Sequence, residues 1–288
     1  MRVLLSIGLL SMAALLGNVP ARACERTDEI SAAQSQSVSE TAAANALSQA
    51  QFDAKAAQEI LRWINQSRAQ AGVAPLALDD ALNLAAQAHA QQMLQRGELS
   101  HQYPGEPDLT LRLAQSGAHF NHAGENVALD FSLQHAHQSL MTSDEHRRNL
   151  LDSSFNAVGI AVVWSRCQMY LVQDFAHQLP TLGAGQAEDL IAEKVATLRT
   201  QTRLPKLNRV KSATIPEICS SGKMKPARAS YSNARYVLSY TNAEPQALPS
   251  SASNVIGNGQ MRDFSVGACY ARTEKNPNGA YFVTMMFY

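Results

Sequence analysis

The pattern of apolar and polar positions predicts two helices between about residues 55 and 97. Four residues recur at helical spacing and share one face of the first helix: Ile60, Trp63, Ile64 and Ser67. Gly72 is the predicted stop of this helix. The second helix starts at Asp79 or Asp80, which are good N-cap residues, and ends at Gly97. Its predicted buried stripe consists of Leu82, Ala85, Ala86, His89 and Met93.

Between this second helix and residue 180 the pattern changes to a loop, a strand, short helices and a hairpin. The loop is predicted at 101–122, where turn residues are frequent, and a short strand at 127–131. Helical segments are predicted at 132–142 and 146–151. Two Val-rich apolar runs within 157–175 are joined by a short turn, and they predict a hairpin that helices cover.

After residue 180 the chain is predicted to form one helix and then strands. An amphipathic helix spans 186–200, with Leu190, Val195 and Leu198 as its apolar points, and Pro205 ends it. We interpret this helix as a linker. The residues from 205 onward show no helical period and predict a small β-rich domain.

Two hairpin segments resemble each other. Phe155–Phe175 and Phe264–Phe287 each contain a Phe followed by Val-Gly, then a turn and an apolar strand. We favour two similar hairpins that arose independently. A degenerate second copy of the first domain's sheet is the alternative.

The N-terminus predicts export. Arg2 precedes an apolar stretch over 3–16, and Ala21-Arg22-Ala23 fits a signal-peptidase site. The stretch is shorter than the roughly 20 residues that span a bilayer, and we predict no transmembrane segment elsewhere. We therefore expect a secreted or periplasmic protein that is cleaved after Ala23. Lipid anchoring at Cys24 is the alternative, which we disfavour because Arg22 precedes the small residue.

An oxidising compartment permits disulfides among the four cysteines, Cys24, Cys167, Cys219 and Cys269. Four cysteines allow three pairings, and spacing does not choose among them. We favour Cys219 with Cys269, because this pair would close one small domain, while Cys24 and Cys167 pair or stay free. Nothing around any of the four indicates an activated thiol.

The charges are distributed unevenly. The 288 residues carry 24 Lys+Arg and 24 Asp+Glu, so the net charge is zero. Residues 1–200 hold 13 basic and 20 acidic residues, a net of −7, whereas residues 201–288 hold 11 and 4, a net of +7.

A cationic cluster in the second part suits anionic envelope polymers or lipid headgroups: Lys206, Arg209, Lys211, Lys223, Lys225 and Arg228. We favour the alternative, a solvated surface that the acidic first part balances. Nucleic acid is not expected as a partner, because the chain is exported and aromatic residues are not interleaved with these charges.

Six of the eight histidines fall between residues 101 and 146, with Glu125 among them: His101, His119, His122, His135, His137 and His146. Two histidines and one carboxylate can hold zinc or another divalent metal and leave a fourth position for water. The spacing is not that of a compact local metal motif. We expect His119 and His122 to be solvated in a loop, and His89, on an apolar stripe, to be structural.

Several motifs follow one another in an order that resembles one family. The matching segments are Ile64-Asn65-Gln66-Ser67-Arg68 with Gly72, Pro75 and Leu76; Leu82, Ala86 and His89; Ser100-His101; Arg112 and Gly117; Gly124-Glu125-Asn126-Val127; 143–151; and Phe155, Val158-Gly159 and Gln173-Asp174-Phe175. They are similar to those of the CAP superfamily, which comprises cysteine-rich secretory proteins, antigen 5 and pathogenesis-related 1 proteins, and especially to its bacterial SCP-like branch. The resemblance covers roughly residues 57–177.

The resemblance implies an α+β fold, a three-layer α-β-α sandwich whose cleft is lined by His101, Glu125 and His146. The sequence departs from the family's pattern at Leu140, where a tryptophan is usual, and at Asp144-Glu145, where Pro-Gly is usual. It has no clear match to the second glutamate of many family members. The expected division is a signal peptide (1–23), a low-complexity arm (24–54), a CAP domain (55–180), a linker helix (181–204) and a basic β-rich C-terminal domain (205–288).

Three functions fit such a cleft. In the first, His101, Glu125 and His146 bind a divalent metal, an envelope or host ligand that is lipid-like or polymeric, or both. In the second, a metal or a histidine activates water to hydrolyse peptidoglycan or protein. In the third, the cluster is structural. We favour binding or a structural role, because no serine or cysteine stands in an evident nucleophile setting, and Ser143 is expected to N-cap the helix that begins there.

Overall fold

The computed structural model describes residues 52–165, 168–211 and 233–288. The signal peptide, almost all of the low-complexity arm, Cys24, Cys167 and Cys219 lie outside these residues, so the predictions about them stay predictions. Cys269 lies inside them and is not free. None of the described helices is long and apolar enough to cross a membrane.

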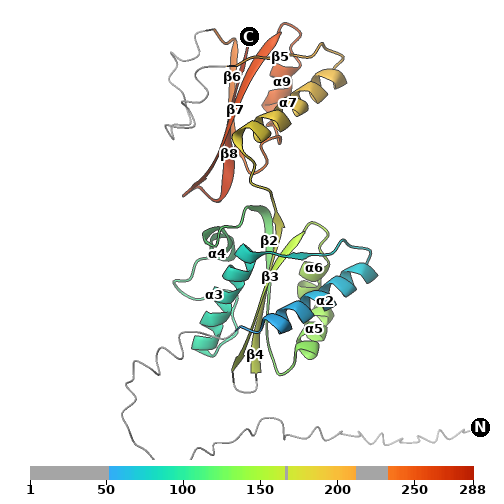
Figure 1. Cartoon of the computed structure of the whole chain (residues 1–288), viewed down its shortest axis with the longest axis vertical. Helices are drawn as coiled ribbons and strands as arrows, with labels where there is room; N and C mark the ends of the chain where they lie inside the picture. The colour runs from blue at the N-terminus through green and yellow to red at the C-terminus, as the bar shows by residue number, and fades with distance from the viewer. Residues whose placement is uncertain (1–51, 166–167, 212–232) are drawn as a thin grey trace, which may run out of the picture. The chain divides into compact units, whose positions relative to one another are not determined.

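The N-terminal lobe is a four-stranded sheet with helices on both faces (Figure 1). Its strand order is β1-β3-β4-β2; β1 runs parallel to β3, and the other neighbours are antiparallel. The elements in chain order are α2 (Ala54–Gln70), β1 (Ala77–Leu78), α3 (Asp80–Arg96), α4 (Leu109–Gln115), β2 (Phe120–Asp130), α5 (Leu133–Thr142), α6 (Asp144–Leu151), β3 (Ala157–Ser165) and β4 (Gln168–Gln178).

The two faces of this sheet are covered by different helices, as the alternation of side chains along β3 shows. Val158 and Ile160 pack with the cluster that holds Ile60 and Ile64 of α2, on the side of α5 and α6. Ala161 and its alternate neighbours on the opposite face pack against α3. The three-layer α-β-α sandwich predicted from the resemblance is therefore confirmed.

Local signals at α3 were predicted correctly. The side chain of Asp79 accepts a hydrogen bond from the backbone N–H of Leu82, and Gly97 closes the helix with a positive φ of 68°. Gly159 explains how closely α3 lies on the sheet, because a Cβ there would stand 2.1 Å from the backbone of Leu82.

The loop predicted at 101–122 was partly wrong. It contains α4, and β2 already begins at Phe120 and runs to Asp130. The period-2 pattern of this strand is hidden because Asn121, His122 and Glu125 are polar residues within it. The strand was therefore recognised only over its last, apolar part.

The C-terminal lobe has the same topology as the first. Its strand order is β5-β7-β8-β6, again with one parallel pair, β5 with β7. Its elements are α7 (Ala184–Gln201), β5 (Asn208–Arg209), β6 (Tyr236–Asn242), α9 (Ser250–Ile256), β7 (Asp263–Thr273) and β8 (Asn276–Phe287). The β-rich character predicted for this region is confirmed, and the repeat that we had disfavoured describes it better than two unrelated hairpins.

Helix α7 belongs to this second lobe. We had interpreted it as a linker, but Ala187, Ile191 and Val195 are fully buried in the core that the second sheet forms. Its place before a short parallel strand is that of α2 in the first lobe. The helix is therefore the first element of the second fold and not a spacer.

One buried arginine holds each lobe together in the same way. Arg68, at the end of α2, donates hydrogen bonds to the backbone oxygens of Ala74, Leu150, Asp152 and Phe155. Arg199, at the end of α7, donates to those of Pro205, Ile256, Asn258 and Met261. Each guanidinium thus joins the first helix, the turn after it and the chain just before the hairpin, which supports the structural repeat.

We predict that Arg68→Met destabilises the protein by about 3–5 kcal/mol, because it leaves several buried carbonyl groups without a donor. Urea unfolding followed by circular dichroism measures this change. Arg62→Met is the matched control, since the Arg62 side chain is exposed and bonds to the side chain of Glu59 and to no buried carbonyl group of the described residues. Equal, small losses in both variants would contradict the role assigned to Arg68.

Candidate ligand-binding cleft

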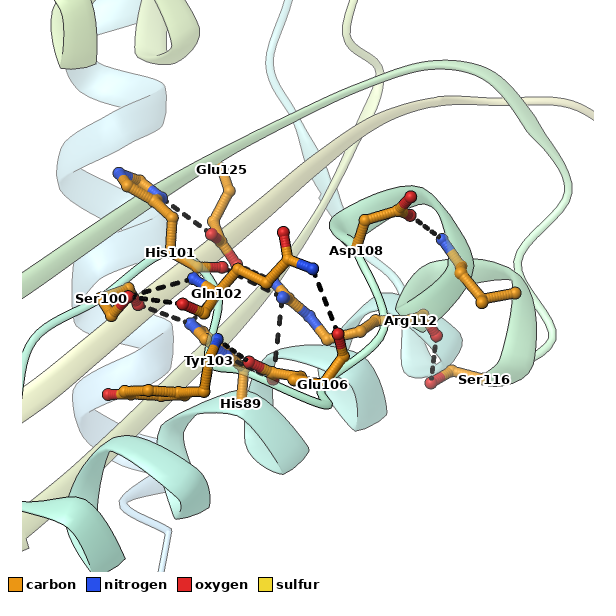
Figure 2. A network of polar contacts seen from close by, with 11 residues as sticks. His89, Ser100, His101, Gln102, Tyr103, Glu106, Asp108, Arg112, Ser116 and Glu125 are labelled. Carbon is orange, nitrogen blue, oxygen red and sulfur yellow. Dashed lines mark hydrogen bonds and ion pairs between the residues drawn. The ribbon is translucent and has the colours of Figure 1, made fainter.

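The centre of the candidate site is the carboxylate of Glu125, in the middle of β2. Its Oε1 accepts a hydrogen bond from Nδ1 of His101 at 2.8 Å, and its Oε2 is in close contact with the guanidinium of Arg112 (Figure 2). Arg112, from α4, also donates to the backbone oxygen of His101 at 3.1 Å. The Glu125 side chain is 4% exposed and that of His101 is 58% exposed. The buried carboxylate therefore orients an exposed imidazole.

A second buried pair lies directly behind this centre. His89 contacts Glu106 through Nδ1 at 2.7 Å and the backbone oxygen of Ser100 through Nε2 at 2.8 Å (Figure 2). The other oxygen of Glu106 accepts from the backbone N–H of Tyr103. Arg112 stands 3.7 Å from Glu106 and so lies between the two carboxylates. The structural role predicted for His89 is confirmed: it fixes the loop that carries His101.

Sequence reasoning missed Glu106 as part of this network. The burial of Glu106 could not be predicted, because a charged residue five positions after His101 in a turn-rich segment is ordinarily solvated. Arg112 was recognised only as a landmark of the resemblance. Its position on α4 gives it a function, since burying Glu125 without a cation would be costly.

His146 is placed by α6 and by an amide network. Its backbone oxygen accepts a hydrogen bond from the side chain of Asn126, next to Glu125 on β2. Asn126 also bonds to Gln173 and to Asn149 of α6. The His146 side chain is half-buried, and burial, together with the charge of the nearby His101, lowers its pKa. The predicted proximity of His101 and His146 is thus supported by their electrostatic interaction.

Asp174 lies beside Glu125 in the register of β2 and β4 and is fully buried. Burial and the charge of Glu125 raise the pKa of Asp174 well above its usual range. Asp174 therefore keeps its proton to a higher pH than Glu125 does. It was noticed in the sequence only as part of a hairpin motif.

The pKa values of Glu125 and His101 are shifted in opposite directions. Burial alone would raise the pKa of Glu125, but the hydrogen bond from His101 and the charge of Arg112 lower it below the usual value. The hydrogen bond to Glu125 raises the pKa of His101, although partial burial opposes the shift. An imidazolium paired with a carboxylate is the state that this geometry favours.

The corresponding place in the C-terminal lobe carries no such chemistry. In the first lobe, Val158 pairs with Phe175 and accepts a backbone hydrogen bond from Asp79. In the second lobe, Phe264 pairs with Phe287 and accepts the equivalent bond from Val210. With these two pairs aligned, each residue of the polar cluster corresponds to an apolar residue of the second lobe: Glu125 to Val237, Asn126 to Leu238, Gln173 to Met285, and Asp174 to Met286. Over the described strands, the polar cleft belongs to the N-terminal lobe alone.

The three predicted metal ligands do not form a ligand set in this arrangement. Both oxygens of Glu125 already accept from His101 and Arg112, and over the described ranges no group of three or more His, Cys, Asp or Glu side chains is placed to hold a metal ion. Glu125 fits the role of a carboxylate that orients a histidine from behind. The residues as they stand do not fit a His-His-Glu metal centre.

The expectation for His119 was wrong, and that for Ser143 holds in part. His119 was expected to be solvated but is 3% exposed, with its ring 4.9 Å from that of Tyr270. Ser143 holds the N-cap position of α6 but makes no capping hydrogen bond with its side chain. His122 is exposed as expected and stacks on Phe155.

The family model described as "Cysteine-rich secretory protein family", or CAP, matches residues 61–175. This segment contains the buried Glu125 and both cleft histidines. Residues 61–175 are a CAP domain. The cluster of His101, Glu125 and Arg112 therefore lies within this CAP domain.

Bacterial relatives resemble the same segment. An uncharacterised protein, YkwD of Bacillus subtilis, is 28% identical over 109 residues, which are 38% of this chain and 42% of that protein. The chain thus spans about two fifths of the length of this curated relative.

Solved structures of bacterial proteins are also similar. An extracellular protein containing an SCP domain from Bacillus anthracis is 29% identical, covering 42% of this chain and 40% of that one, with a TM-score of 0.39. A cysteine-rich secretory protein from Staphylococcus aureus is 22% identical, covering 43% and 39%, with a TM-score of 0.36.

We predict that Glu125→Gln lowers the pKa of His101 toward its ordinary value of about 6.5, because the neutral amide cannot stabilise the imidazolium. Asp174→Asn is the matched comparison and should change that pKa less, since the raised pKa of Asp174 favours its neutral form. Proton NMR of the imidazole C–H signals during a pH titration measures both. A shift caused by Asp174→Asn but not by Glu125→Gln would contradict the assignment of charges.

Proposed function

We propose that the CAP domain is a binding module, whose cleft engages an acidic polymer of the cell envelope, such as peptidoglycan, through His101 and His146. The orientation of His101 carries this proposal. Its Nδ1 is engaged by Glu125, so Nε2 is left for a ligand, and more than half of the side chain is exposed. The raised pKa of His101 favours the imidazolium, whose Nε2–H suits a carboxylate or phosphate acceptor.

Most of the other polar groups in the cleft are already bonded to protein. The side chain of Asn126 bonds to His146, Gln173 and Asn149, and Arg112 faces Glu125 and Glu106. These bonds support a rigid frame with two histidines at its surface, more than they support a flexible catalytic centre. The protein is exported on our reading of its N-terminus, which brings envelope polymers within reach.

The charge of the C-terminal lobe gives weaker support to the same partner. Of the predicted cationic cluster, Arg209 is engaged by Glu188 and Asp189 at 2.8 and 2.5 Å, so its charge is balanced within the lobe. Lys223, Lys225 and Arg228 lie outside the described residues. We therefore base the proposal on the cleft and not on the basic cluster.

We predict that the purified protein sediments with peptidoglycan sacculi and that the His101→Ala/His146→Ala double variant loses most of this binding. His122→Ala/His177→Ala is the matched control, because these two histidines contact Asp152 and Asn121 and make no hydrogen bond to Glu125 in the described residues. The control should bind like the wild type. Equal binding by the wild type and the double variant would overturn the proposal.

We predict that this binding weakens as the pH rises through the pKa of His101, which lies above the ordinary histidine value of about 6.5. The charged pair of His101 with Glu125 also contributes stability that is fully present below that ordinary value and is lost as the pH rises through the raised one. Sedimentation over a pH series, with the fold monitored by circular dichroism, separates the two effects. Binding that strengthens with rising pH would exclude the imidazolium as the contact.

Hydrolysis is the second candidate, because a histidine oriented by a buried carboxylate is also the arrangement of a general base. Release of soluble fragments from sacculi, measured by mass spectrometry against the double variant as background, tests it. A metal would add a water-activating group, and elemental analysis of the purified protein tests for one. In that case the imidazoles of His101 and His146 would be its ligands, and Glu125 would act through His101.

A further inference from the structure

Arg272, near the end of β7, is one of the residues through which the C-terminal lobe contacts the CAP domain. Arg272 donates hydrogen bonds to the backbone oxygens of Ala114 at 2.8 Å, Gly117 at 2.7 Å and Ala118 at 3.0 Å. These three carbonyls end α4 and begin the turn after it. A guanidinium at this place satisfies acceptors that a helix leaves open and complements the negative end of its dipole.

The same helix carries the cation of the cleft. Arg112 precedes Ala114 by two residues. The backbone oxygen of Arg112 accepts hydrogen bonds from the N–H and the hydroxyl of Ser116, so Arg112 belongs to the last turn of α4 (Figure 2). From there its guanidinium reaches Glu125 and the backbone of His101. A rotation of the end of α4 would carry Arg112 away from the carboxylate that it neutralises.

Strand β8 also contacts the strand that carries Glu125. The side chain of Asn278 donates to the backbone oxygen of Phe120, the first residue of β2, at 2.7 Å. Next to it the ring of His119 is buried against Tyr270 and Tyr281. The contact therefore includes both elements that place the Arg112–Glu125 pair, and it contains packed rings as well as polar bonds.

We propose that Arg272 is a positioning residue for the cleft: by bonding the end of α4, the C-terminal lobe holds Arg112, and through it Glu125 and His101, in place. The second lobe, which lacks the polar cluster in its own sheet, thus serves the site of the first. The proposal deepens the proposed function, since it concerns the same cleft, but the readouts below need no ligand and are independent of what the cleft binds.

The test compares Arg272→Ala, Arg272→Lys and Arg209→Ala in the full-length protein. Arg209→Ala is the matched control. It also removes one cation from the C-terminal lobe, but Arg209 pairs with Glu188 and Asp189 of the same lobe. Hydrogen exchange reports the amides of residues 116–118, and NMR reports the solvent exchange of the Arg112 Nε–H, which belongs to a buried side chain. Circular dichroism checks that each variant is folded.

In Arg272→Ala we expect both exchange rates to rise about tenfold, as loss of charge-assisted hydrogen bonds at a helix end predicts. Lysine cannot span three carbonyls and should give an intermediate result, and Arg209→Ala should match the wild type. Faster exchange at 116–118 with an unchanged Arg112 Nε–H would show a purely local contact and overturn the proposal. No change at either place would overturn it as well.

Discussion

The interaction on which the site depends is the burial of the Glu125 carboxylate between His101 and Arg112. A carboxylate in a sheet interior is tolerated only when charges and donors compensate its lost hydration. Here one oxygen faces an imidazole and the other a guanidinium. Three features of the site follow from this constraint: the orientation of His101, the lowered pKa of Glu125, and the raised pKa of Asp174 beside it.

The two lobes show which features serve the fold and which serve the site. Arg68 and Arg199 occupy corresponding positions and make the same kind of bonds to backbone carbonyls, so this arginine belongs to the architecture. Glu125 and Asp174 correspond to Val237 and Met286, so this topology does not by itself require acids at these two positions. The acids are the part of the sheet that we assign to the proposed function.

The sequence predicted the parts of the fold that depend on neighbouring residues. Asp79 and Gly97 bound α3 as expected, because capping acts within one turn. The order of motifs predicted that His101, Glu125 and His146 share a cleft, and the structure joins the first two by a hydrogen bond. Glu106 and Asp174 could not be assigned to it in advance, because their burial depends on a loop and two strands that meet only in three dimensions. The repeat was undervalued for a similar reason: it lies in strand order and register, whereas the residues at corresponding positions have diverged.

The central claim is that Glu125 orients His101 through its Nδ1, which leaves Nε2 for a ligand. The ¹⁵N chemical shifts of the His101 ring, measured by NMR above its pKa, test this most directly, because they distinguish the two neutral tautomers. We predict that the proton stays on Nδ1, bonded to Glu125, and that Nε2 carries no proton. A proton found on Nε2, with Nδ1 unprotonated, would contradict it.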